Sequence, residues 1–254
     1  MNATQTDRRR LRLDELLVAR GEFASRSRAR DAIARGVVKV DGDIATKAGQ
    51  PVAENAVLRI DDPARHYVSR AALKLTAALD HFGIDPDGSL ALDIGASTGG
   101  FTQVLLERGA RHVIALDVGH GQLDPNLAGN AGITLLEGLN ARELTLAHLS
   151  DRRPDLLVCD VSFISLKLAL PPALGLAKSG AQGVFLVKPQ FEAGREAIGK
   201  GGLLRDPGLA ERIAEELRDW LDAVPGWRAL GYHTSPIEGG DGNREFLLAG
   251  VKDR

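Results

Sequence analysis

The sequence predicts an α/β fold, in which a doubly wound, mostly parallel Rossmann-like sheet follows a small α+β domain. Three observations favour it. Apolar runs alternate with helical patterns between residues 89 and 188, as is typical of strands joined by crossover helices. A glycine-rich turn follows the first of these runs. The first 60 residues are basic and carry helix and hairpin signals of their own.

Composition limits the possible classes of protein. The 254 residues are enough for one sizeable α/β domain and a small one. No apolar run approaches the roughly 20 residues that span a bilayer, and the N-terminus lacks the apolar core of a signal peptide. Cys159 is the single cysteine, so no internal disulfide can form and a cytoplasmic location is expected. The six histidines are scattered, and we expect no metal.

The basic head has a regular pattern. Residues 1–60 carry 12 Lys and Arg against 8 Asp and Glu, a net charge of +4, whereas the rest of the chain carries 20 against 26, or −6. Helical patterns cover residues 13–20 and 26–35, and Ser25 is expected to cap the second. An alternating run then enters an Asp-Gly turn, a strong hairpin signal, and residues 58–60 close the unit. A basic head on an acidic body suggests contact with a polyanion.

The string RLDELLVARGEFASRSRARDAIARGVVKVDG resembles the compact RNA-binding module named after ribosomal small-subunit protein four. In that module the second helix and the following turn contact the RNA backbone. The resemblance therefore implies an RNA-binding face, and the alternative is a helix face that is merely solvated. Five basic residues against one acid between positions 26 and 39 favour RNA contact. The candidates are Arg26, Arg28, Arg30, Arg35 and Lys39.

A break in the pattern follows the head. An Asp-Asp-Pro sequence at residues 61–63 has few apolar neighbours. A rigid proline in such a context is a plausible domain boundary. We therefore expect an RNA-binding domain over residues 1–62, a linker over 63–68 and the larger domain over 69–254.

The larger domain contains five expected strands, at residues 89–95, 112–118, 133–137, 155–161 and 183–188. The first strand leads into DIGASTGG and then into a helix. A dinucleotide-binding turn would need glycine in place of Ser97, and a phosphate-binding P-loop would need lysine in place of Phe101. An acid before the turn and no lysine after it suit a positively charged ligand such as S-adenosylmethionine. A tight turn without a ligand is the alternative.

Ligands of doubly wound sheets bind at the carboxyl ends of the strands. Asp117 ends the second strand, where its carboxylate can take the two hydroxyls of an adenosine ribose. Asn140 follows the third strand and is a candidate for the adenine, and Asp160 ends the fourth, where it would favour a sulfonium. The remaining cofactor-binding candidates lie in and beside the turn: Asp93, Gly95, Ser97, Thr98, Gly99, Gly100 and Phe101.

Two buried apolar strands end in a lone charge, at Asp160 and at Lys188. Buried charges are costly unless they are used or paired. Pro189 stops the second of these strands, which favours a functional Lys188 over a lysine that emerges into solvent. Lys74 lies beside small residues on a predicted helix and is free to reach a cleft. Glu245 opens a C-terminal strand that we expect to be antiparallel, which brings it to the same sheet edge.

Lys74, Asp160, Lys188 and Glu245 match, in order and context, the K-D-K-E tetrad of FtsJ-like RNA 2′-O-methyltransferases. Nearly the whole chain resembles the TlyA family of ribosomal RNA cytidine 2′-O-methyltransferases, often labelled haemolysins. The matching motifs are YVSRAALKL, LDIGASTGGFT, CDVSFISL, LVKPQFEAGR and GGDGNREFLL. The resemblance implies methylation of a ribose 2′-hydroxyl with S-adenosylmethionine and without a metal. It also implies that Lys188 is the base, that Asp160 orients it, and that Lys74 and Glu245 position the ribose.

Ribosomal RNA or a ribosomal subunit is therefore the expected partner, and a basic loop with Arg195 and Lys200 is expected at the catalytic edge. Three alternatives are weaker. The first is a base or small-molecule methyltransferase, but base-nitrogen methylation usually uses an aromatic or Asn-Pro-Pro-Tyr-like clamp where this chain has Asp-Val-Ser-Phe. A membrane-lytic haemolysin would need a span or a long basic amphipathic helix. A bare RNA-binding protein would leave the tetrad and the glycine turn unexplained.

Overall fold

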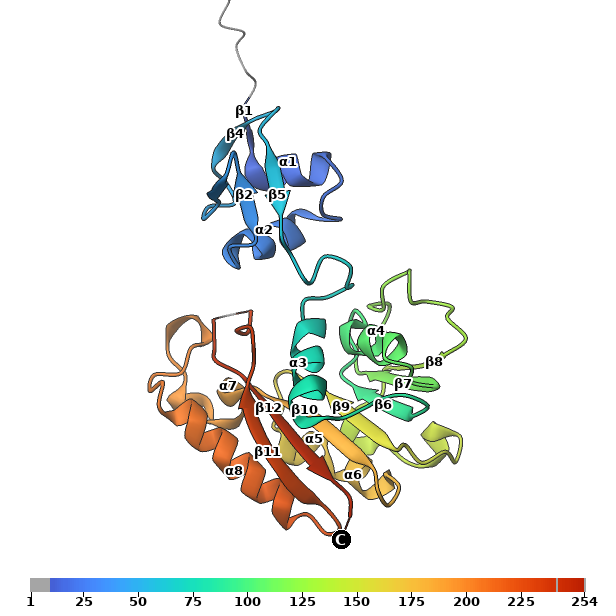
Figure 1. Ribbon diagram of the computed structural model, residues 1–254. Helices are drawn as coiled ribbons and strands as arrows, with labels where there is room; N and C mark the ends of the chain where they lie inside the picture. Colours follow the sequence, from blue (N-terminus) through green and yellow to red (C-terminus); the bar gives the residue numbers. More distant parts are fainter. Residues whose placement is uncertain (1–9, 241, 254) are drawn as a thin grey trace, which may run out of the picture. The chain divides into compact units, whose positions relative to one another are not determined.

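The computed structural model describes residues 10–240 and 242–253. The chain divides into two compact units, one that ends at His66 and one that begins at Tyr67 (Figure 1). The division falls within the segment expected as a linker. Each unit has a hydrophobic core of its own.

The N-terminal unit combines two helices with short antiparallel strands. The helices are α1 (Leu13–Ala19) and α2 (Arg26–Ala34). One sheet has the order β3-β2-β5, with β2 (Val38–Val40), β3 (Asp43–Ile44) and β5 (Leu58–Ile60). A separate pair joins β1 (Arg10–Arg12) to β4 (Pro51–Ala53). The predicted helix cap is confirmed, because the Ser25 side chain accepts a hydrogen bond from the backbone N–H of Arg28. The predicted hairpin is confirmed between β2 and β3.

The C-terminal unit is built on a seven-stranded sheet with the order β11-β12-β10-β9-β6-β7-β8 (Figure 1). The five predicted strands are confirmed and are parallel: β6 (Leu90–Ile94), β7 (His112–Asp117), β8 (Ile133–Glu137), β9 (Leu156–Cys159) and β10 (Gln182–Val187). The C-terminal strand β12 (Phe246–Val251) is antiparallel to β10, as expected. A further antiparallel edge strand, β11 (Arg228–Thr234), was not predicted.

Helices cover both faces of this sheet. Side chains of α3 (Ala72–Phe82) and α4 (Gly100–Glu107) share one core with alternate strand residues. The opposite core contains side chains of α5 (Leu166–Ala169), α6 (Pro171–Leu176) and α8 (Leu209–Ala223). Short elements complete the unit: α7 (Pro189–Glu192), η1 (Ala141–Glu143), η2 (Ala147–Leu149), η3 (Arg195–Ala197) and η4 (Lys200–Gly202). The doubly wound fold is thus confirmed.

The segment before α3 is held by hydrogen bonds to Ser69. The side chain of Ser69 accepts a hydrogen bond from the N–H of Ala71, and the carbonyl of Ser69 accepts one from the N–H of Ala72. These bonds close tight turns before the regular helix, which begins at Ala72 without a side-chain cap. Lys74 consequently lies in the first turn of α3, where it is buried.

Candidate active site

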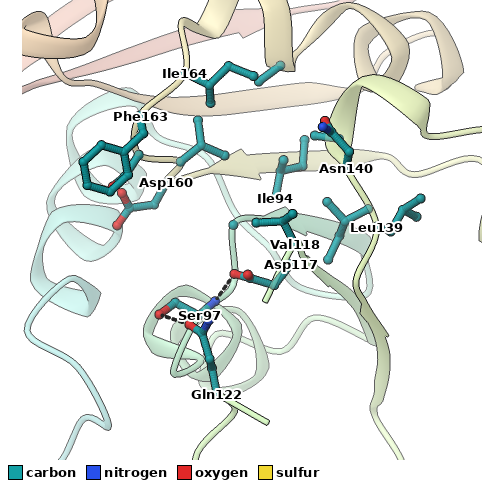
Figure 2. Close-up of a pocket in the computed structure, with 16 residues that line it drawn as sticks. Ile94, Ser97, Asp117, Val118, Gln122, Leu139, Asn140, Asp160, Phe163 and Ile164 are labelled. Atoms are coloured by element: carbon teal, nitrogen blue, oxygen red, sulfur yellow. Dashed lines mark hydrogen bonds between the residues drawn. The ribbon is translucent and has the colours of Figure 1, made fainter. Parts of the chain in front are cut away.

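A cavity of about 530 Å³ opens at the carboxyl ends of β6, β7 and β9. Figure 2 shows Asp160 and Phe163 on one side of it, Asn140 and Leu139 on another, and Asp117 with Ser97 between them. Its volume lies in the range of sites for small molecules and cofactors. The position is the one that doubly wound sheets use for ligands.

The glycine turn forms one wall of this cavity. Gly95 has φ +83°, and a Cβ added to it would lie 2.7 Å from the backbone oxygen of Asp160. Only glycine allows β6 and the loop after β9 to approach so closely. Ser97 also has a positive φ, and its N–H donates to Asp117 Oδ2 at 2.8 Å (Figure 2).

Asp117 is held in a fixed orientation at the end of β7. Its Oδ1 accepts a hydrogen bond from the N–H of Gly119 at 2.7 Å, while Oδ2 accepts the bond from Ser97. Each carboxylate oxygen has a second lone pair for a ligand hydroxyl. Asn140 also lines the cavity, and its Oδ1 caps η1 by accepting from the N–H of Arg142 at 3.0 Å. Its amide NH₂ group is the part that can contact a ligand.

Asp93 does not line the cavity, contrary to the expectation that it would lie beside a ligand. Its side chain is fully buried, and Oδ2 accepts a hydrogen bond from the hydroxyl of Thr102 in α4 at 2.6 Å. Residues alternate along β6, and Asp93 shares the face of Ala91, which packs beneath α3 and α4. Burial raises the pKa of Asp93 to about 7, against the opposing effect of the Thr102 hydrogen bond. Asp93 therefore anchors α4 to the sheet.

Gly99 also differs from its expected role. It has φ +94°, and an added Cβ would lie 2.5 Å from Leu127 and 2.7 Å from Leu123. Its Cα thus faces apolar side chains of the β7–β8 connection and lines neither of the cavities described here. The glycine is required by its backbone conformation and by this packing.

A second cavity, of about 160 Å³, adjoins the first and shares with it Gly95, Ser97, Asp160 and Ser162. Lys188 lines this smaller cavity. The other residues around it come from the turn, from the start of α4 and from the segment before α3: Ala96, Thr98, Gly100, Phe101, Ser69 and Ala71. The two cavities meet at Asp160, which lies between Lys188 and the residues that are candidates for binding adenosine.

Strand register explains why the charged residues gather here. The last pair between β10 and β12 joins Val187 to Phe246, and Lys188 and Glu245 are the next residues on each strand. Alternation places Lys188 on the face of Leu186, and Glu245 on the face of Leu247, which is the face that α3 covers. By the same rule Asp160 shares the face of Val158.

The tetrad forms two ion pairs. Lys74 Nζ lies 2.5 Å from Glu245 Oε2, and both side chains are buried. Lys188 Nζ lies 2.6 Å from Asp160 Oδ1, and these two side chains are 13% and 16% exposed. Lys188 and Asp160 line the smaller cavity, whereas Lys74 and Glu245 line neither of the cavities described here. A Cβ on Gly239 would lie 2.6 Å from Glu245 Oε1, so the preceding loop needs glycine there.

Three residues of the site were missed in the sequence. Gln122 Oε1 accepts a hydrogen bond from the Ser97 hydroxyl at 3.1 Å, and Ser162 Oγ accepts one from Lys188 Nζ at 2.9 Å. Phe163 is 89% exposed at the rim of the larger cavity, with φ +65°. The motif CDVSFISL carried the signal for two of them, because polar and aromatic residues directly after a parallel strand lie at the ligand edge.

The arginine candidates of the N-terminal unit have acidic partners. Arg26 Nη2 and Arg30 Nε lie 3.1 Å and 2.8 Å from the buried carboxylate of Asp14, and Arg12 Nε lies 3.1 Å from it. Burial raises the pKa of Asp14, but the hydrogen bonds from Arg12, Arg30 and Arg26 outweigh it and hold that pKa well below its usual range. Arg26 and Arg30 are about half exposed. A guanidinium has five N–H donors, so each keeps donors for a phosphate.

Arg35 is a correction to the set of RNA-binding candidates. Its side chain is 14% exposed, and it donates two hydrogen bonds to Asp62, at 2.7 Å and 2.9 Å, and one to Asp31 at 2.9 Å. It thereby ties α2 to the segment that follows β5, and its guanidinium is directed inward. These ion pairs stabilise the unit, and little of the Arg35 side chain is exposed.

The other basic candidates lie in the two units separately. Arg28 is half-buried and donates to the backbone oxygen of Ala64 at 3.5 Å, and Lys39 lies on β2. In the C-terminal unit, Arg195 and Lys200 are exposed on η3 and η4, in the loop between α7 and α8.

Across residues 10–240 and 242–253, no group of three or more His, Cys, Asp or Glu side chains is placed to hold a metal ion. No helix in these ranges is long and apolar enough to cross a bilayer.

Comparison with known proteins adds family membership to this geometry. Residues 67–252 match the model of the FtsJ-like methyltransferase family, and residues 11–58 match the S4 domain. The chain is 44% identical over 241 residues to the 16S/23S rRNA (cytidine-2'-O)-methyltransferase TlyA of Mycobacterium tuberculosis. This match covers 94% of this chain and 89% of that protein. It is 39% identical to Hemolysin A of Brachyspira hyodysenteriae, over 93% of this chain and 98% of that protein.

A solved structure agrees with these matches. A protein of Streptococcus thermophilus, provisionally named as a haemolysin, superposes with a TM-score of 0.74 at 37% identity. The match covers 97% of this chain and 90% of that one. The chain therefore belongs to the FtsJ-like methyltransferases, in the TlyA branch that carries an S4 domain before the catalytic domain.

Proposed function

We propose that this enzyme transfers a methyl group from S-adenosylmethionine to the ribose 2′-hydroxyl of a cytidine in ribosomal RNA. The observation that carries the proposal is the Lys188–Asp160 pair at the meeting point of two cavities, one large enough for an adenosine and one beside the lysine. The name of the Mycobacterium tuberculosis relative supports the choice of cytidine and of ribosomal RNA.

The residues around the larger cavity fit S-adenosylmethionine. Asp117 offers carboxylate lone pairs for the ribose hydroxyls, Asn140 offers an amide for the adenine edge, and Ile94 and Leu139 offer apolar surface for the ring. Gly95 lets the turn pack directly against the backbone of Asp160, since a side chain there would meet that backbone. When bound, the cofactor supplies an electrophilic methyl group on a positively charged sulfur. Asp160, which lines both cavities, would lie close to that charge.

Lys188 is the base in this proposal. A ribose hydroxyl is a poor nucleophile at neutral pH, so its proton must leave as the oxygen–methyl bond forms. The hydroxyl proton would pass to the lone pair of Lys188 Nζ while the hydroxyl oxygen bonds to the methyl group that a bound cofactor would supply, with a neutral thioether as the leaving group. Asp160, 2.6 Å from Nζ, stabilises the ammonium that results. Holding hydroxyl and methyl group in line contributes much of the remaining acceleration.

RNA docking is assigned to the N-terminal unit. The half-exposed Arg26 and Arg30, arranged around Asp14, offer guanidinium donors for phosphates, and Arg28 and Lys39 lie on the same small unit. Arg195 and Lys200 add exposed positive charge to the catalytic domain, in the loop between α7 and α8. A ribosomal substrate also favours a cytoplasmic location for this protein.

Replacing Lys188 by alanine tests the proposal. Methyl transfer to ribosomal subunits should be abolished, while calorimetry should give an S-adenosylmethionine affinity within a few-fold of wild type. A large loss of affinity would move Lys188 from catalysis to cofactor binding. Because two relatives carry haemolysin names, the purified protein should also be incubated with erythrocytes. Lysis that survives in Lys188→Ala would indicate a separate activity.

A further inference from the structure

Ser162 lies in the loop after β9 and lines both cavities. Its Oγ accepts a hydrogen bond from Lys188 Nζ at 2.9 Å, and Asp160 Oδ1 lies 2.6 Å from the same nitrogen. The two oxygens come from positions two residues apart in one loop, and the lysine comes from the end of the neighbouring strand β10. The loop thus places beside one amine a hydroxyl that accepts its hydrogen bond and a carboxylate oxygen that is in ion-pair contact with it.

The geometry of an amine makes a second acceptor important. A lysine that acts as a base must be neutral, and a neutral amine has two N–H bonds and one lone pair. If a single acceptor is present, one N–H is fixed and the lone pair can rotate about that bond. Two acceptors fix both N–H bonds, and the lone pair is then confined to the remaining direction. Because Lys188 also lines the smaller cavity, its lone pair can then face a ligand in that cavity.

The chemical type of the second acceptor also fits. A second carboxylate would favour the ammonium form, which has no lone pair to accept a proton. A serine hydroxyl accepts the N–H bond without adding charge. Asp160 therefore supplies the charge that stabilises the product ammonium, and Ser162 supplies direction.

We propose that Ser162 is a positioning residue that, together with Asp160, orients the lone pair of Lys188 toward the smaller cavity. The inference rests on the proposed function, because it takes Lys188 as the base that receives the 2′-hydroxyl proton. Ser162 itself neither gains nor loses a proton in the step. Its contribution is the fixed direction from which the amine meets the hydroxyl.

Kinetics of Ser162→Ala are the first test. Small misplacements of reacting groups can cost about 100-fold in rate, so we expect single-turnover methyl transfer to ribosomal subunits to fall by roughly 10- to 100-fold. The S-adenosylmethionine affinity should stay within a few-fold of wild type, and alkaline pH should not restore the rate. Ser162→Thr keeps a hydroxyl and should recover most of the activity. Ser179→Ala, an exposed serine after α6, is the matched control and should behave as wild type.

The second test needs no cofactor. In protein labelled with ¹³C-lysine, methylene relaxation reports the order of the Lys188 side chain, and its resonance is assigned by its absence in Lys188→Ala. We expect Lys188 Cε to be more mobile in Ser162→Ala than in wild type, and unchanged in Ser162→Thr and Ser179→Ala. Thermal unfolding checks that all variants are folded.

Several results would overturn the inference. One is a Ser162→Ala rate within twofold of wild type, and another is an unchanged order of Lys188 Cε. Recovery of the rate at alkaline pH would mean that the serine tunes proton affinity and not direction, and a collapse of S-adenosylmethionine affinity would place it in cofactor binding. The proposed function fails separately, if Lys188→Ala itself retains methyl transfer.

Discussion

Replacing Lys74 by methionine tests whether the buried ion pair behind the active site holds the catalytic domain together. Methionine keeps the apolar stem but leaves the carboxylate of Glu245 without its partner at 2.5 Å. The two side chains are 7% and 2% exposed, so little solvent can replace the lost ammonium. Removing one partner of a buried pair costs about 3–5 kcal/mol.

That loss is large relative to the total stability of a domain, roughly 5–15 kcal/mol. A unit of this size shifts its melting temperature by about 2–4 °C for each kcal/mol, so Lys74→Met should melt roughly 6–20 °C lower. The double variant Lys74→Met with Glu245→Gln removes the unpaired charge and should recover much of this loss. Methyl transfer should stay low in both variants, because the family resemblance implies that Lys74 and Glu245 position the ribose.

The assays are thermal and urea unfolding of the full chain, together with single-turnover methyl transfer to ribosomal subunits. Glu245→Gln alone completes the double-mutant cycle, from which the coupling energy of the pair follows. A loss below about 1 kcal/mol in Lys74→Met would refute the argument from burial. Recovery of methyl transfer in the double variant would show that the charges of this pair have no part in the reaction.

Three further predictions concern other parts of the molecule. Burial raises the pKa of Asp93 to about 7, above the unfolded value of about 3.9. The stability that protonated Asp93 contributes is therefore present below pH 4 and is lost as the pH rises to 7. Asp93→Asn should remove this decline, and equal pH slopes of the unfolding free energy for both proteins in urea would contradict the prediction. Gly95→Ala should weaken S-adenosylmethionine binding in calorimetry, because the added Cβ meets Asp160. Gly121→Ala is the control: Gly121 has φ +63° and no atom within 4 Å of an added Cβ, so this variant should lose only about 1–2 kcal/mol of stability. Equal S-adenosylmethionine affinities of the two variants would count against this account of the turn. Arg26→Gln with Arg30→Gln should weaken RNA binding and reduce the slope of log affinity against log salt by roughly 0.7–0.9 for each lost phosphate contact, and an unchanged slope would exclude these arginines from the interface.

The sequence predicts well the features that depend on local pattern. The apolar runs that became β9 and β10 are continuous and bounded by polar residues, as buried parallel strands are. The placement of Lys188 and Glu245 at the same edge of the sheet followed from one topological rule, that the start of an antiparallel strand lies beside the end of a parallel one. These features need no knowledge of distant neighbours.

The features that were missed depend on contacts between distant segments. Gly99 faces Leu123 and Leu127, which lie more than 20 residues later in the chain. Arg35 is neutralised by Asp62, in a segment that the sequence pattern marked only as a boundary. Asp93 could have been placed correctly, because strand alternation puts its side chain on the face of the sheet that α4 covers. The prediction instead followed the attraction of a carboxylate for a sulfonium.

The central claim is that the methyl group goes to a ribose oxygen of a cytidine in ribosomal RNA, and nucleoside mass spectrometry tests it most directly. Ribosomal subunits from a strain that lacks this enzyme are incubated with the purified protein and isotopically labelled S-adenosylmethionine, and the RNA is digested to nucleosides. We expect the label in 2′-O-methylcytidine, and none with Lys188→Ala. Label in a base-methylated nucleoside, or no label with the wild-type protein, would contradict the account.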